Sequence, residues 1–184
     1  MKKQTYNEAI PVRVSTPISL TTLVQAAMIA AIYVVLTFIA NAFGLANYAV
    51  QVRFSEALTI LPYFTPAAIP GLFIGCLLSN ILTGCALPDI IFGSLATLLG
   101  ALGTYALRRW KWCAPICPII ANTLIVPLIL IYGYGLLIDG LSTLQCFGYY
   151  SLTVGAGEII SCGILGMILL LSLQKYQGRI FNRI

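Results

Sequence analysis

The sequence predicts an all-α integral membrane protein, a bundle of six transmembrane helices, and two observations carry this prediction. First, 60% of the 184 residues are hydrophobic and only 8% are charged, whereas a soluble domain is typically about 25% charged. The mean hydropathy is +0.97. A soluble core of this size cannot hide so much apolar surface, so lipid must be the solvent. The length leaves room for one domain with short loops.

The second observation is the placement of the basic residues, nine of which fall in three clusters among ten Lys and Arg in total. Under the positive-inside rule all three clusters lie in the cytoplasm, so an even number of helices separates each cluster from the next. Both termini are then cytoplasmic. The clusters are Lys2, Lys3 and Arg13; Arg108, Arg109 and Lys111; and Lys175, Arg179 and Arg183.

Four helices are predicted between the first two clusters. Apolar runs give one helix at Leu20–Ala40 and another at Pro88–Leu107. The chain between them must cross and return. Proline breaks helices, so Pro62, Pro66 and Pro70 mark the turn between a helix at Arg53–Phe64 and one at Ala67–Leu82. The helix that begins at Arg53 is short and spans only if it is tilted or shielded by its neighbours.

Two further helices are predicted between the second and third clusters, at Ala114–Leu137 and Phe147–Leu173, joined outside by the loop with Asp139 and Gly140. The single transmembrane domain therefore covers 1–184. It has a cytoplasmic N-terminal segment at 1–18, the six-helix bundle at 19–174 and a cytoplasmic tail at 175–184. Rows of small residues, Gly71-Gly75-Ser79 and Gly93-Ala96/Thr97-Gly100, predict close packing inside the bundle.

Acidic residues are the first candidates for function, because polar groups inside a membrane are costly and usually functional. Of the five acids, Glu8 falls in the N-terminal segment and Asp139 in the outer loop. Glu158 lies near mid-membrane in the last helix, beside Gly155 and Gly157. It either bonds a neighbouring helix as a neutral acid or meets a cationic or multi-donor ligand.

Three more polar residues join this list. Asn122 lies at a depth similar to Glu158 and either lines the same cavity or makes an interhelical hydrogen bond. Glu56 follows Arg53 by three residues, so the two form either an intrahelical pair or part of a binding site. The alternating segment 48–56 predicts an extended lid over a pocket. Asp89 follows Pro88 and is either a helix N-cap or a site residue.

Several function classes are excluded by what the sequence lacks. It has no G-x-x-x-x-G-K phosphate loop, no histidine and no G-x-S-x-G motif, so ATP hydrolysis and the usual hydrolytic chemistry are not expected. The basic clusters are separated by apolar segments, so they indicate membrane topology and not nucleic-acid binding. Six cysteines without a C-x-x-C pair predict buried thiols and no metal site. We expect a protein that is not an enzyme, needs no cofactor, and binds and passes a small molecule.

One family resembles this chain from about Leu23 to Leu171. The residues that carry the likeness are Arg-Phe-Ser-Glu at 53–56 with the proline-rich stretch up to Gly75, Asp89 with the run 92–97, and Gly157-Glu158. They resemble the QueT family, substrate-binding S components of energy-coupling factor (ECF) transporters in the bacterial cytoplasmic membrane. The resemblance implies the six-helix S-component fold. It also implies partnership with the transmembrane coupling protein EcfT and two ATPase subunits, which hydrolyse the ATP.

The resemblance also implies a ligand, a queuosine precursor such as 7-aminomethyl-7-deazaguanine or queuine. Glu158 and Glu56 would accept the guanine-like N–H donors and the ammonium group, in either assignment. Asn122 would hydrogen-bond the ring carbonyl, and Tyr132 or Phe92 would stack on the ring. Arg53 and Asp89 complete the predicted site.

The resemblance further implies that small residues in the first helix contact the coupling protein. Ala26 with Ala30, and Ala27 with Ala31, form two A-x-x-x-A pairs, each on one helix face. Internal packing is the other explanation for them. Two other functions stay open: an S component for another vitamin-like ligand, and a stand-alone small-molecule carrier. A membrane enzyme is the weakest alternative.

Overall fold

The computed structural model describes residues 19–44 and 52–181, and within these ranges every regular element is helical. Three of these elements, at Asp89–Gly93, Ile129–Gly133 and Ile159–Gly166, are π-helical turns that continue directly into or out of α-helices. The elements are α1 (Leu20–Ala42), the 3-10 helix η1 (Phe54–Tyr63), α2 (Ala68–Leu82), η2 (Asp89–Gly93), α3 (Ser94–Ala106), the 3-10 turn η3 (Lys111–Cys113), α4 (Ile116–Leu128), η4 (Ile129–Gly133), α5 (Thr143–Glu158), η5 (Ile159–Gly166), α6 (Met167–Gln174) and α7 (Gln177–Ile180).

Four continuous helices in the described part are long and apolar enough to cross a membrane: Leu20–Ala42, Asp89–Ala106, Lys111–Gly133 and Thr143–Gln174. This confirms the all-helical, membrane-capable character of the chain. The other two predicted helices exist but are shorter, since α2 has 15 residues and η1 has 10. The count of six spans therefore stays a prediction.

The segment η1 differs from an ordinary transmembrane helix. It contains Pro62, and eight of its ten residues are buried against α1, α3 and η5. A 3-10 helix rises about 2.0 Å per residue, so ten residues reach about 20 Å. The neighbouring helices therefore shield η1 from the surroundings of the bundle.

The predicted extended lid at 48–56 is wrong for the part that the structure describes. Residues 48–51 lie outside the described ranges. Arg53 is extended, with φ −106° and ψ 110°, but Phe54 to Glu56 already belong to η1.

Small residues let α1 and α2 approach closely. A Cβ atom added at Gly71 would lie 2.7 Å from the carbonyl oxygen of Ala26, and one added at Gly75 would lie 2.8 Å from Cβ of Tyr33 and 3.0 Å from Cα of Ala30. Ala26 and Ala30 are accordingly buried, so this pair packs against α2 inside the bundle. Ala27 and Ala31 are exposed on the other side of α1.

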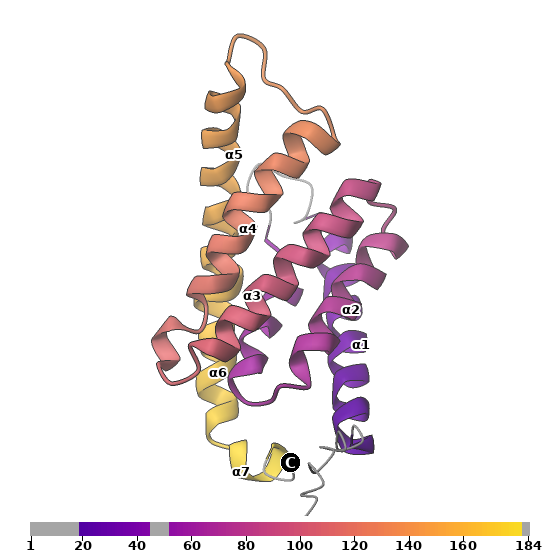
Figure 1. The fold of residues 1–184 in the computed structure, drawn as a ribbon, viewed down its shortest axis with the longest axis vertical. Helices are drawn as coiled ribbons and strands as arrows, with labels where there is room; N and C mark the ends of the chain where they lie inside the picture. The colour runs from indigo at the N-terminus through magenta and orange to yellow at the C-terminus, as the bar shows by residue number, and fades with distance from the viewer. Residues whose placement is uncertain (1–18, 45–51, 182–184) are drawn as a thin grey trace, which may run out of the picture.

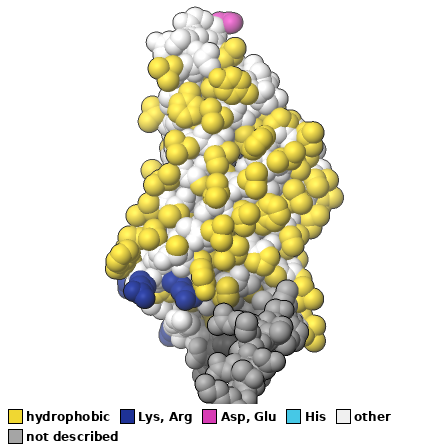
Figure 2. All heavy atoms as spheres, in the orientation of Figure 1, with side chains coloured by type: hydrophobic (Ala, Val, Ile, Leu, Met, Phe, Trp, Pro, Cys, Tyr) yellow, Lys and Arg dark blue, Asp and Glu magenta, His cyan; other side chains and the backbone are white. Residues whose placement is uncertain are grey.

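The two ends of the bundle differ in charge. In Figure 1, α1 begins at the lower end, where the α3–α4 connection and the end of α6 also lie. Figure 2 shows Lys and Arg side chains at this end, an acidic side chain at the opposite tip, and apolar side chains between. We call the two ends the basic end and the distal end. Lys2, Lys3, Arg13, Arg183 and Glu8 lie outside the described residues.

Candidate functional site

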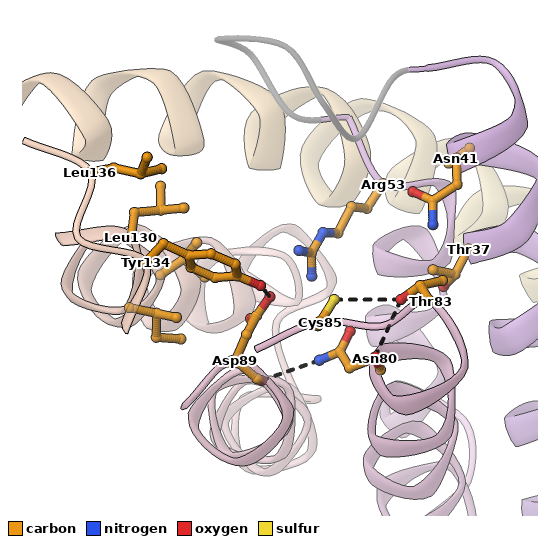
Figure 3. Close-up of a pocket in the computed structure, with 13 residues that line it drawn as sticks. Thr37, Asn41, Arg53, Asn80, Thr83, Cys85, Asp89, Leu130, Tyr134 and Leu136 are labelled. Atoms are coloured by element: carbon orange, nitrogen blue, oxygen red, sulfur yellow. Dashed lines mark hydrogen bonds between the residues drawn. The ribbon is translucent and has the colours of Figure 1, made fainter. Parts of the chain in front are cut away.

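A cavity of about 480 Å³ opens at the distal end, between α1, α2, η2 and the α4–η4 helix (Figure 3). Its volume lies within the range of about 300–1,000 Å³ that is usual for small-molecule sites. Polar and apolar side chains both line it. The polar residues are Thr37, Asn41, Arg53, Asn80, Thr83, Cys85, Asp89 and Tyr134, and the apolar residues are Ala40, Val126, Ile129, Leu130 and Leu136.

The Arg53 guanidinium projects into this cavity (Figure 3). Its backbone N–H donates to Ser161 Oγ at 3.2 Å, which fixes the start of η1 against η5. Within the described residues, no carboxylate lies within the 4.0 Å ion-pair distance of the guanidinium. The intrahelical pair with Glu56 is therefore not formed, and Glu56 instead donates its backbone N–H to the Arg53 carbonyl at 3.1 Å. Arg53 presents donors to the cavity.

Asp89 supplies a carboxylate to the same cavity. It is only 6% exposed, and its Oδ2 accepts a 3.1 Å hydrogen bond from the Tyr134 hydroxyl. Asn80 Nδ2 donates to the Asp89 carbonyl at 3.2 Å. The N-cap alternative is wrong, because no side-chain capping bond occurs at this helix start. A Cβ at Gly93 would lie 2.8 Å from Asp89 Oδ1, so glycine leaves the room that the carboxylate needs.

A second polar group, the buried glutamate cluster, consists of Glu56, Glu158, Asn122, Tyr33 and Cys162. Glu56 accepts hydrogen bonds from the Tyr33 hydroxyl and from Asn122 Nδ2, the latter at 3.4 Å. The Cys162 thiol donates to Glu158 Oε2 at 3.1 Å. One oxygen of each carboxylate and the Cys162 sulfur all lie within 4.8 Å of one another. The two glutamates are 1% and 6% exposed.

The glutamate cluster lies next to the cavity. Thr37 and Val126 line the cavity, and each lies one helical turn from a residue that hydrogen-bonds Glu56. Those residues are Tyr33 in α1 and Asn122 in α4. One turn corresponds to about 5.4 Å, so the cluster adjoins the cavity at a greater depth in the bundle.

Phe92 and Tyr132 are not brought into this site. They are 53% and 76% exposed and line a separate apolar groove of about 540 Å³ between the α3 and α4 helices. The aromatic residue that does line the polar cavity is Tyr134. Sequence reasoning also missed Tyr33 and Asn80. Both are polar residues within apolar helices, and that is the signal that could have found them.

An apolar helical bundle with four membrane-capable helices and a polar, ligand-sized cavity at one end is typical of a multi-pass membrane protein with a small-molecule site. The QueT transporter family model matches residues 23–175. The chain therefore belongs to the QueT family of transporters.

One relative shows how far the likeness extends at the level of individual residues. The queuosine precursor transporter QueT of Lactococcus lactis subsp. cremoris (strain MG1363) is 34% identical over 90 residues, which cover 48% of this chain and 53% of the relative. The match thus spans about half of the length of that relative. No solved structure matches the chain.

Proposed function

We propose that this chain is the membrane-embedded substrate-binding subunit, the S component, of an ECF-type importer. In this proposal it captures a queuosine precursor, 7-aminomethyl-7-deazaguanine or queuine, from outside the cell. Membership of the QueT family over residues 23–175 is the observation that carries the proposal. The polar cavity supports it, because it opens at the end opposite the basic residues, which is the outer end under the positive-inside rule.

The energy for uptake comes, in this proposal, from EcfT and two ATPase subunits. The absence of a phosphate loop from this sequence agrees with ATP hydrolysis on separate chains. The exposed Ala27–Ala31 pair is the part of the predicted partner contact that stays accessible in α1. Small residues there permit close approach of another helix.

Ligand recognition divides between the cavity and the glutamate cluster. Asp89 accepts the two adjacent N–H groups of the guanine-like edge, as a carboxylate does in a bidentate contact. Arg53 donates to the ring carbonyl, and Tyr134 packs on the ring. Glu56 and Glu158, with Asn122, receive the ammonium arm.

Cysteine labelling tests the orientation. In variants that retain only Cys85 or only Cys113, a membrane-impermeant maleimide added to intact cells should label Cys85, which lines the cavity and is partly exposed. Saturating 7-aminomethyl-7-deazaguanine should slow this labelling. Cys113, at the basic end, should react only after permeabilisation. Labelling of Cys113 from outside would show that the basic end faces outward, which contradicts the proposed orientation.

Uptake assays test the transporter class. Cells that cannot make queuosine precursors should accumulate labelled 7-aminomethyl-7-deazaguanine when this chain is expressed with the coupling module, and not when either is expressed alone. Uptake with the chain alone would favour a stand-alone carrier. Uptake of another vitamin-like compound in place of the precursor would support the assignment as an S component and contradict the assignment of the ligand.

A further inference from the structure

The glutamate cluster places two carboxyl groups side by side, and no described Lys or Arg nitrogen contacts either of them. Glu56 and Glu158 are almost fully buried, and one oxygen of each lies within 4.8 Å of the other. Within the described residues, no Lys or Arg nitrogen lies within 4.0 Å of either carboxyl group. Two like charges this close in a buried place strongly disfavour simultaneous ionisation.

Four titratable side chains face the pair, from the elements packed around it. They are Tyr33 from α1, Arg53 at the start of η1, Cys76 from α2 and Cys162 from η5. The α4 helix contributes the neutral amide of Asn122. The one cation among these groups is Arg53, and its guanidinium projects into the cavity that it shares with Asp89 (Figure 3). One guanidinium therefore stands against three carboxyl groups, those of Glu56, Glu158 and Asp89, and is within ion-pair distance of none of them.

The hydrogen bonds distinguish the two glutamates. Glu56 receives an O–H donor from Tyr33 and an N–H donor from Asn122, and both bonds favour its ionised form. Glu158 is contacted by the weaker S–H donor of Cys162 at 3.1 Å, a donor that the Glu56 backbone carbonyl shares at 3.3 Å. A single proton held by the pair therefore belongs on Glu158.

We propose that the ligand-free protein holds one proton on the Glu56–Glu158 pair, on Glu158, and that the ammonium group of a cationic ligand displaces this proton when it binds. The proton leaves to solvent, and the ammonium nitrogen then faces two carboxylates. The displacement step rests on the proposed function, whereas the bound proton does not. A neutral ligand of the same shape displaces no proton and gains no electrostatic attraction from the two carboxylates.

Infrared spectroscopy of the purified, ligand-free protein tests the bound proton. At pH 7 we expect the carbonyl stretch of a protonated, buried carboxyl group. Glu158→Gln should remove the band, and Asp139→Asn, a change of the exposed acid in the distal loop, should leave it. Absence of the band from the wild type would overturn the proposal, as would its persistence in Glu158→Gln. A metal ion held by the pair and Cys162 would also abolish the band, and this result would overturn the bound proton in the same way.

A second variant keeps this test decisive if Glu158→Gln does not fold. Glu56→Gln removes the neighbouring charge and retains an amide that can bond Tyr33. The band should then titrate away at a lower pH than in the wild type, because Glu158 no longer faces a carboxylate. An unchanged titration midpoint would contradict the coupling between the two groups.

Calorimetry in two buffers with different ionisation enthalpies tests the displacement. Binding of 7-aminomethyl-7-deazaguanine near pH 7 should release about one proton, and affinity should rise up to about tenfold per pH unit where release is complete. The 7-methyl analogue has the same ring without the amine and should release none. Binding without proton release would overturn the displacement while the proposed function stands. No binding of the probe, with the infrared band present, would remove this compound as the ligand and the displacement with it, and would leave the bound proton supported.

Discussion

Replacing Asp89 by Asn should weaken binding of 7-aminomethyl-7-deazaguanine by about 2–3 kcal/mol, roughly 30- to 150-fold. Asp89 is the carboxylate that lines the cavity, and it is buried. An amide has one acceptor oxygen and presents N–H groups where the ligand also has donors, so a bidentate contact becomes a partly repulsive one. Titration calorimetry of the purified variant measures the change.

The matched control for Asp89 is Asp139→Asn. Asp139 lies near the same end of the bundle but is exposed in the loop before α5, so its replacement should leave affinity unchanged. Tyr134→Phe removes the hydroxyl that donates to Asp89 and should have an effect between the two. Equal affinities for the wild type and Asp89→Asn would show that another residue binds the guanine-like edge of the ligand. Glu56 would be the next candidate.

Gly75→Leu should destabilise the protein strongly, because α1 packs directly against this position of α2. Its Cβ would lie 2.8 Å from Tyr33 Cβ and 3.0 Å from Ala30 Cα, and backbone atoms cannot move aside as a flexible side chain can. Forcing extra methylene groups into a packed interface costs about 1–3 kcal/mol, occasionally more. Because Tyr33 donates to Glu56, separation of α1 from α2 should also disturb the glutamate cluster. Thermal unfolding in detergent, followed by size-exclusion chromatography, measures the effect.

Gly148→Leu is the control for this substitution. Gly148 is an exposed position in α5, and a Cβ atom there meets nothing within 4 Å. The control should retain the wild-type melting temperature or raise it slightly, since leucine favours a helix more than glycine does. A Gly75→Leu protein that melts with the wild type would contradict the close α1–α2 contact.

Much of the architecture was predictable, because hydropathy and charge act along the whole chain. The apolar runs located the helices, and Gly71 and Gly75 were correctly expected to pack inside the bundle. The 3-10 form of η1 was not predictable from hydropathy. The segment is buried against α1, α3 and η5, and the last two of these are distant from it in the sequence.

The aromatic residues show where sequence reasoning about the site failed. Phe92 lies in η2 and Tyr132 in η4, two π-helical turns with i→i+5 hydrogen bonds. Such turns shift the direction of the side chains away from the usual helical periodicity, so the facing of these two residues could not be extrapolated along the helix. Tyr134, at the end of η4, reaches the cavity in their place.

The first-helix alanines illustrate a different limit. Periodicity places Ala26 with Ala30 on one face and Ala27 with Ala31 on the neighbouring one, but both pairs have the same composition. Only the position of α2 distinguishes them. It buries Ala26 and Ala30 and leaves Ala27 and Ala31 exposed.

Binding of 7-aminomethyl-7-deazaguanine to the purified, unmodified chain, measured by titration calorimetry, tests the central claim most directly. The proposed function predicts saturable one-to-one binding of this compound. Queuine should either compete with it for the site or bind in the same way. Absence of binding by either compound to folded protein, while another vitamin-like compound such as riboflavin binds, would contradict the assignment of a queuosine precursor as the ligand.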